Sequence, residues 1–265
     1  MFKHAIYPLV FATLAALTAC AGFGGKSLED QSGQAFNPDQ LAAQEDLPKF
    51  STETARDGLP SGWNFYRIAP NKKNTIYRLE NYQGRTVLSA NSKTSASGLA
   101  VKLRPRQANN LWLQWEWKAL SAMPEADNAE RYRDDAPLRI MVAFDGNKSK
   151  LSLKEKMTFE MANLISGQEM PYATLMYIWS GKAPVDTIIN NALTSRIKMI
   201  VVDSGWDNLG QWHQHQRDLA VDYKRAYGEA PGEVIGIALL TDTDNTKSET
   251  RAFYGDIELV RKIPK

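Results

Sequence analysis

The sequence predicts a mainly β protein, an antiparallel β-sandwich of jelly-roll type with one or two inserted helices. Short runs rich in Val, Ile, Tyr and Trp recur along the chain, many of them alternate between apolar and polar residues, and turn residues separate them. Only two segments show helical spacing, which argues against a parallel α/β sheet. The β-like runs are residues 63–68, 75–82, 85–91, 98–104, 111–120, 138–144, 173–179, 196–204, 234–241 and 251–260.

The amino-terminal residues 1–19 have the pattern of a bacterial lipoprotein signal peptide. Lys3 precedes an apolar run, residues 5–17, that is too short for a stable membrane span. The run ends in LTAC, the lipoprotein processing pattern, and Cys20 is the only cysteine of the chain. We expect Cys20 to carry the lipid that anchors the protein to a membrane. Because alanine follows it, we expect the outer membrane of the cell envelope, facing the periplasm. An ordinary secretory peptide with a chance cysteine is the alternative.

The rest of the chain divides into a tether and one domain. Residues 20–49 are rich in Gly, Gln and acidic residues and are expected to form a flexible tether after the lipidated cysteine. Residues 50–265 have a suitable length for a single β-sandwich domain. Removal of residues 1–19 leaves 31 basic and 30 acidic side chains. This near-neutral balance, without a concentrated basic surface, argues against nucleic-acid binding.

Two segments are predicted to be helical. Ser152 and Glu155 form a capping box, and Gly167 follows where a helix would stop. Between them runs an apolar stripe, made by Leu153, Met157, Met161 and Leu164. The second segment is residues 217–228, which has apolar residues at helical spacing on one face. Both helices are expected to be insertions between strands.

A polar face is the first candidate ligand site. Alternation in residues 111–120 places Trp112, Gln114, Glu116 and Lys118 opposite the apolar side chains of the same run. If the strands that carry Glu116, Arg139 and Lys198 were neighbours, these three side chains would share a face. Bordered by Trp112 or Trp179, such a face would bind a sugar through ring stacking and charged groups. The alternative is a solvated face with cross-strand ion pairs.

Two further clusters contain chemically active residue types. Asp134 and Asp135 precede a strand and are candidate ligand-binding or acid and base residues, although adjacent residues at a strand entry usually point in different directions. His213 and His215 would share a face on a strand and could both contact a metal. No third ligand stands at a recognisable spacing, so we interpret them as surface histidines rather than a zinc site.

The segment TDTDNT, residues 241–246, is a candidate for calcium or for a turn. It is not an EF-hand loop, because Lys247 and Phe253 occupy the positions that need glycine and glutamate. The strand that follows contains Tyr-x-Asp-Ile and resembles the closing strand of carbohydrate-binding jelly rolls, whose aspartate helps hold a structural calcium. Asp242, Asp244 and Asp256 are therefore candidate calcium ligands, and a turn shaped by Asp and Asn is the alternative.

Several motifs occur together in the order of a known bacterial family. They are LPSGW at 59–63, SASGL at 95–99, LWLQWEWKAL, the DD before LRIMVAFD, LMYIWS, SRIKMIVVDSG, RDLAVDYKRAYGEAP, and TDTDNT followed by AFYGDIEL. In these motifs the chain resembles, over nearly all of residues 59–260, the family catalogued as domain of unknown function number 3047. The resemblance implies a secreted β-sandwich and no established activity.

The leading functional hypothesis is a lipid-anchored module that binds a glycan or another envelope polymer. A carbohydrate-active enzyme, a hydrolase or lyase that uses Asp134, Asp135, Glu116 or Asp242, is the first alternative. An envelope assembly partner whose face meets another protein is the second.

Overall fold

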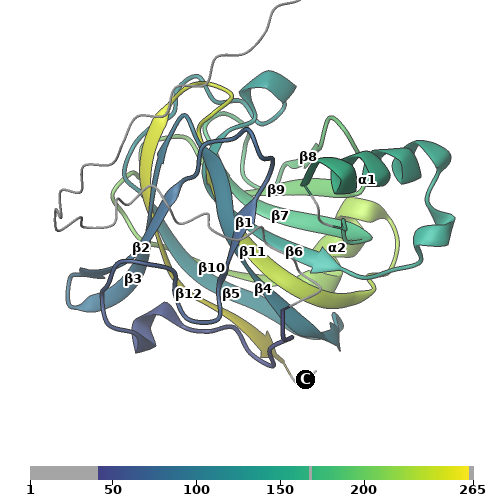
Figure 1. Cartoon of the computed structure of the whole chain (residues 1–265), viewed down its shortest axis with the longest axis horizontal. Helices are drawn as coiled ribbons and strands as arrows, with labels where there is room; N and C mark the ends of the chain where they lie inside the picture. Colours follow the sequence, from purple (N-terminus) through teal and green to yellow (C-terminus); the bar gives the residue numbers. More distant parts are fainter. Residues whose placement is uncertain (1–40, 167–168, 263–265) are drawn as a thin grey trace, which may run out of the picture. The chain divides into compact units, whose positions relative to one another are not determined.

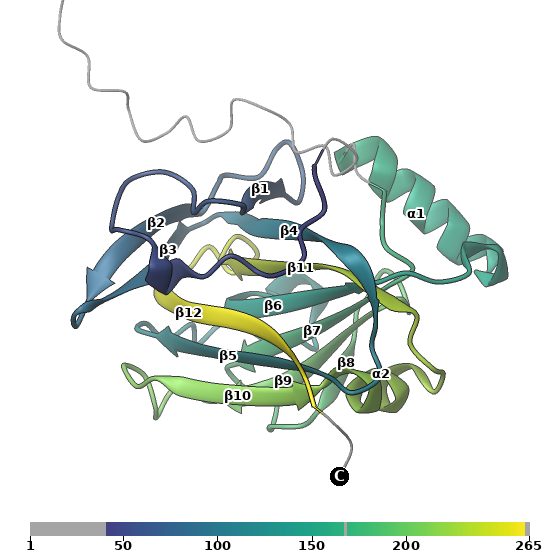
Figure 2. The ribbon, with the colours of Figure 1, turned by 90° about the horizontal axis from the view of Figure 1, so that it is seen from below.

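Two β-sheets stack face to face in the computed structural model, which describes residues 41–166 and 169–262 (Figures 1 and 2). The larger sheet has seven strands in the order β1 (Asn64–Arg67), β4 (Ala96–Gln107), β11 (Glu233–Asp242), β6 (Ala136–Phe144), β7 (Ala173–Ser180), β9 (Ile197–Ser204) and β8 (Ile188–Asn190). The smaller sheet has five strands in the order β10 (His213–Asp218), β5 (Leu111–Ala119), β12 (Glu249–Arg261), β3 (Arg85–Lys93) and β2 (Ile76–Tyr82). Strands β7 and β9 pair in parallel and all the other pairs are antiparallel. The predicted β-sandwich is confirmed.

The hydrophobic core lies between the sheets, where the predicted inward side chains meet. Along β5 the residues Leu111, Leu113, Trp115 and Trp117 are buried, and the three residues between them are partly exposed. The last two residues of the strand are buried as well. Trp115 packs across the sandwich on Tyr177 of β7, with ring centroids 5.1 Å apart. Truncation of a buried tryptophan such as Trp117 usually costs about 3–5 kcal/mol, so this layer of rings is a major source of stability.

Both predicted helices are present as insertions. Helix α1 (Leu153–Ser166) joins β6 to β7, and helix α2 (Leu219–Tyr227) follows β10 directly. The side chain of Asp218 caps α2 by accepting hydrogen bonds from the N–H groups of Ala220 and Val221. Gly228 ends α2 with a left-handed φ of 72°, which glycine adopts without strain. Within the described residues, short 3-10 helices span Phe50–Thr52, Arg131–Arg133 and Lys148–Lys150.

The apolar stripe of α1 faces away from the core. Its members Leu153, Met157, Met161 and Leu164 are all exposed. The helix is held instead through Glu155, which accepts hydrogen bonds from Thr194 and Ser195 of the segment before β9. Of the helices in the described ranges, none is both long and apolar enough to cross a bilayer.

The ordered fold begins earlier than residue 50. Gln44 pairs with β4, because its N–H donates to Lys102 O and its C=O accepts from Arg104 N, each at 2.9 Å. Leu47 is buried in the core. The tether was expected to extend to residue 49, but the domain already includes Gln44 and Leu47. A segment with few apolar residues can still form backbone hydrogen bonds with a strand of the sheet, so composition alone placed the boundary too far along the chain. The predicted signal peptide, the lipidation of Cys20 and the start of the tether lie outside the described residues.

Two strands were not predicted. Strand β10 alternates between His or Arg and Gln rather than between apolar and polar residues, so it lacks the usual pattern of a half-buried strand. Strand β8 has only three residues. Each lies at the edge of its sheet, where polar side chains are common.

Candidate functional site

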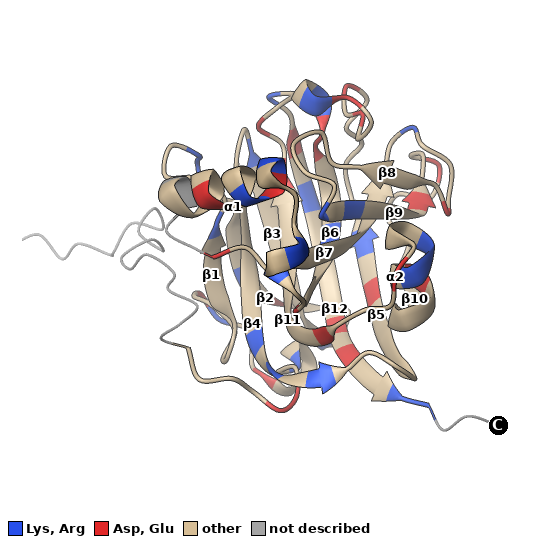
Figure 3. Cartoon of the chain, turned by 90° about the vertical axis from the view of Figure 1, so that its right-hand side faces the viewer, with Lys and Arg blue, Asp and Glu red and all other residues tan. Residues whose placement is uncertain are grey.

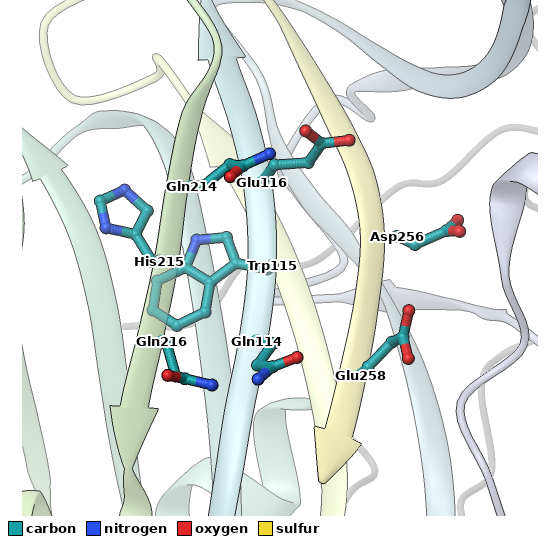
Figure 4. Close-up of a pocket in the computed structure, with 8 residues that line it drawn as sticks. All are labelled: Gln114, Trp115, Glu116, Gln214, His215, Gln216, Asp256 and Glu258. Atoms are coloured by element: carbon teal, nitrogen blue, oxygen red, sulfur yellow. The ribbon is translucent and has the colours of Figure 1, made fainter.

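A hollow of about 520 Å³ lies on the five-stranded sheet, over three neighbouring strands (Figure 4). Strand β5 contributes Gln114 and Glu116, β10 contributes Gln214 and Gln216, and β12 contributes Asp256 and Glu258. Trp115 and His215 complete the lining. On the face of the sheet that points away from the core, amides therefore lie on β10 and β5 and carboxylates lie on β5 and β12.

Strand register explains why these side chains come together. Gln214 pairs with Glu116 and Gln216 pairs with Gln114, so the outward residues of β5 and β10 stand side by side. On the other side of β5, Glu258 pairs with Gln114. A β-bulge between Tyr254 and Ile257 adds one residue to β12 opposite β5. It brings both Asp256 and Glu258 to the outer face, which strict alternation would not do.

Each carboxylate of the hollow has a partner. Glu116 pairs with Arg85 of β3. Asp256 accepts hydrogen bonds from Ser51 N at 3.0 Å and from Ser51 Oγ at 2.5 Å. Glu258 pairs with Lys49 at 2.9 Å. The acidic groups are thus held separately by different cations and donors, and Figure 3 shows acidic positions on both β5 and β12.

Two tryptophans lie beyond the ends of the Gln and Glu rows on β5 and β10. Trp112 and Trp212 are half-buried, and the strand register places them at opposite ends of the Gln and Glu rows. The ammonium of Lys262 lies 3.8 Å from the Trp112 ring, and the guanidinium of Arg85 lies 4.1 Å from the Trp212 ring. At about 3.4 Å per residue the two ends are about 20 Å apart along β5, a length suited to an extended ligand.

The predicted polar face of Glu116, Arg139 and Lys198 is wrong, because these residues are not on neighbouring strands of one sheet. Glu116 lies on β5 in the five-stranded sheet, whereas Arg139 on β6 and Lys198 on β9 lie in the seven-stranded sheet. Lys198 donates to Asn190 on β8. Burial lowers the pKa of Lys198, and the charge of Arg196 lowers it further.

Arg139 is buried in an ion-pair network and has only 3% of its side chain exposed. Its Nε lies 3.0 Å from Asp242 Oδ1, and its Nη2 lies 2.9 Å from Asp134 Oδ1. Burial lowers the pKa of Arg139, but the carboxylates of Asp134 and Asp242 raise it above its usual value. Burial raises the pKa of Asp242 to about 7, and the Arg139 guanidinium opposes that rise. The network joins strands and loops and leaves no guanidinium surface for a ligand.

Two other predicted ligand residues are also internal. Trp179 is 1% exposed, and its Nε1 donates to Gly205 O at 2.8 Å, so it cannot border a sugar site. Asp135 accepts hydrogen bonds from Thr246 N at 2.7 Å and Thr246 Oγ1 at 2.6 Å, which fixes the TDTDNT loop. Asp134 and Asp135 point to different partners, and they do not form a carboxylate pair with a shared ligand.

The expected calcium ligands do not converge. Asp242 binds Arg139, and Asp244 pairs with Lys72. Asp256 lies on β12 of the other sheet and accepts hydrogen bonds from Ser51. Because each carboxylate already has a cation or hydrogen-bond donor, the loop matches the turn interpretation rather than the calcium one. Within the described ranges, no group of three His or acidic side chains involves these aspartates.

The hollow contains residues that the sequence did not single out as a site. Gln214, Gln216 and Glu258 were missed, and Asp256 was considered only as a calcium ligand. The signal was present in HQHQRD, whose alternate glutamines share one face if the segment is a strand. Its two histidines occupy the other face, where Asp203 of β9 contacts both of them. Asp203 was missed as well.

Solved structures with a similar fold share little sequence with this chain. A family 11 carbohydrate-binding module from Clostridium thermocellum, in complex with a β-1,3-1,4-mixed-linked tetrasaccharide, is 10% identical over 83% of this chain and 97% of its own, with a TM-score of 0.42. A family 12 xyloglucanase from Bacillus licheniformis is 7% identical over 83% and 99%, with a TM-score of 0.43. An exo-β-agarase is 12% identical over 84% of this chain, which spans only 25% of that enzyme, with a TM-score of 0.36. These likenesses concern the fold alone.

A comparison with curated proteins finds no match. The family model described as protein of unknown function (DUF3047) matches residues 61–258. This range begins just before β1, includes all the strands from β1 to β11, and ends within β12. The chain belongs to this family.

Proposed function

We propose that the protein is a lipid-anchored protein of the cell envelope that binds a glycan or another extended envelope polymer in the hollow of the five-stranded sheet. The observation that supports this proposal is the row of amides and carboxylates between Trp112 and Trp212. Amides and carboxylates bind hydroxyl groups, and tryptophan faces stack on the apolar sides of sugar rings. Lipid attachment at Cys20 and placement in the outer membrane are parts of the same proposal and rest on the sequence pattern.

Binding is preferred to hydrolysis because the four acids considered for an enzyme do not come together around one point. Of the four acids considered for an enzyme, Asp134 and Asp242 bind Arg139, and Asp135 holds the backbone of residues 245–246. Glu116 lies on the other sheet and pairs with Arg85. A glycosidase needs two carboxyl groups on either side of one bond, and these four residues do not meet that requirement.

The test uses the full-length protein in detergent with a glycan array and with purified peptidoglycan. Trp112→Ala and Trp212→Ala should each weaken binding tenfold or more, which corresponds to about 1.4 kcal/mol. Tyr132→Ala is the matched aromatic control, because Tyr132 is 77% exposed and lies outside the hollow. Retention of full binding by both tryptophan variants, or no binding by the wild type, would refute the proposal.

The amides are tested by a paired variant. Gln214→Ala with Gln216→Ala removes two amides from the edge strand and should also weaken polymer binding. Asn163→Ala on α1 removes an exposed amide elsewhere and should leave binding unchanged. The anchor is tested separately, because Cys20→Ser should move the protein from the membrane fraction to the soluble fraction. Mass spectrometry that finds an unmodified Cys20 would contradict the lipid attachment.

A further inference from the structure

Asp203, His213 and His215 form a cluster between the two sheets, on the opposite face of β10 from Gln214 and Gln216. Asp203 comes from β9 of the larger sheet, and the histidines come from β10 of the smaller sheet. Asp203 Oδ1 lies 2.6 Å from His213 Nδ1, and Asp203 Oδ2 lies 2.8 Å from His215 Nε2. One ligand atom from each residue lies within 4.8 Å of the others.

A second β-bulge turns Asp203 into this position. Ile178 pairs with Val201, but the next residue Trp179 pairs with Asp203, so Val202 is an extra residue in β9. Val202 packs in the core between the sheets, and Val201 packs on the opposite face. In a regular strand the residue after the inward-facing Val202 would point to the opposite face, so Asp203 would point away from β10. The bulge therefore places a carboxylate beside two imidazoles.

Aromatic rings hold the two imidazoles in place. His213 packs on Trp179 with ring centroids 4.7 Å apart, and His215 packs on Trp115 with centroids 4.9 Å apart. Trp117 Nε1 donates to Asp203 Oδ2 at 2.6 Å. Hydrogen bonds of this kind to a ligand carboxylate are typical of the surroundings of metal sites. Trp115 also has a buried Nε1 without a hydrogen-bond partner in the described part of the chain.

We propose that Asp203, His213 and His215 bind a first-row transition-metal dication, of which Zn²⁺ is the simplest example. Zinc ligands lie at about 2.0–2.2 Å from the metal, so tetrahedral ligand atoms are about 3.3 Å apart. The separations of 2.6 Å and 2.8 Å need to open by about 0.7 Å and about 0.5 Å, which small side-chain rotations provide. Two imidazoles with one carboxylate suit zinc and its neighbours, whereas calcium and magnesium prefer oxygen ligands alone.

The site leaves one coordination position for solvent or a ligand. The side chains of His213, His215 and Asp203 are 18%, 14% and 10% exposed, so water reaches a partly buried cluster. Three protein ligands with an open fourth position distinguish zinc sites that bind a further molecule from closed structural sites. The two histidines were visible in the sequence, but the third ligand is ten residues away on a strand of the other sheet.

The experiment uses the full-length protein after treatment with EDTA and dialysis. Titration calorimetry with Zn²⁺ should show one metal per chain, and Co²⁺ should give visible absorption bands from nitrogen ligation. Asp203→Asn, His213→Gln and His215→Gln should each weaken Zn²⁺ binding at least tenfold. Asp207→Asn is the control, because Asp207 is exposed and lies near Asp203 in sequence. It should bind Zn²⁺ like the wild type.

Two outcomes would overturn the proposal. The first is that the wild-type protein takes up no stoichiometric Zn²⁺ and shows no Co²⁺ bands. This result does not depend on the folding of any variant. The second is a set of variants that are folded by circular dichroism and bind Zn²⁺ as tightly as the wild type. Because the readout is metal binding, failure of this proposal is distinct from failure of polymer binding in the hollow.

Discussion

Gly255 allows Glu116 to lie close to β12, and Gly255→Ala would therefore disturb the hollow directly. A Cβ at Gly255 would lie 2.5 Å from Glu116 Cγ and 2.6 Å from its Oε1. Ordinary contact begins at 3.4 Å, so the Glu116 side chain must move by about 1 Å. The backbone tolerates alanine, because Gly255 is not among the residues with a positive φ.

The expected cost in stability is small, because the neighbour that must move is a side chain. Glu116 would leave its preferred rotamer at about 0.5–1.5 kcal/mol, and it would weaken its ion pair with the 40% exposed Arg85 at about 0–1 kcal/mol. Alanine also restricts the unfolded chain, which offsets about 0.4–1 kcal/mol of this. The free energy of unfolding should fall by at most about 2 kcal/mol.

Polymer affinity should fall more sharply than stability. The displaced Glu116 fills part of the hollow between Gln114 and Gln214, so we expect at least tenfold weaker binding. Urea unfolding followed by circular dichroism measures stability, and the peptidoglycan and glycan assays measure affinity. Gly236→Ala is the control, because its Cβ lies 3.1 Å from Val101 O in the other sheet and should not alter binding. Unchanged affinity of a folded Gly255→Ala protein would refute this reasoning.

Two further predictions concern the scaffold. In Gly98→Ala the new Cβ would lie 2.0 Å from the backbone oxygen of Leu239, whereas in the control Gly236→Ala it would lie 3.1 Å from the nearest backbone oxygen. Overpacking and lost hydrogen bonds between the strands should lower the free energy of unfolding of Gly98→Ala by about 3–5 kcal/mol. Equal urea midpoints for the two variants would contradict this prediction. Burial raises the pKa of Glu155, but hydrogen bonds from Thr194 and Ser195 lower it more, so it lies below 4.5. This contact stabilises the protein above pH 4.5 and is lost as the pH falls through the lowered pKa. The protection of the α1 amides, relative to their intrinsic exchange rates, should then be lower at pH 3 than at pH 6, and the difference should be smaller in Glu155→Gln. Equal protection of wild-type α1 at the two pH values would be the contrary result.

Local patterns in the sequence were sufficient to predict most strands and both helices. The alternation along β5 predicted which tryptophans are internal, because the period of a strand is a local property. The amino-terminal cap of α1 was predicted for the same reason, and Ser152 Oγ does accept a hydrogen bond from Glu155 N. Local patterns do not show which strands are neighbours, so Glu116 and Arg139 were placed on one face although they belong to different sheets.

The fate of Arg139 shows a second limit of alternation. Alternation along β6 places Arg139 on the face of the sheet opposite the core, which predicted that its side chain is exposed to solvent. Other side chains cover this face of the sheet at Arg139. Asp134, Asp242 and Met199 surround the guanidinium. A charged residue on the face opposite the core is therefore not necessarily available to a ligand, and its burial depends on loops that are distant in sequence.

Both candidate sites depend on β-bulges, which explains why neither was fully predicted. In β9 the extra residue turns Asp203 inward to the histidines, and in β12 the bulge after Tyr254 turns Asp256 outward to the hollow. Strict alternation would give each aspartate the opposite direction. A bulge is defined by the partner strand as much as by its own residues, and it reverses the facing of every residue after it. The same sandwich with regular strands would retain its core but would bring neither carboxylate to its site.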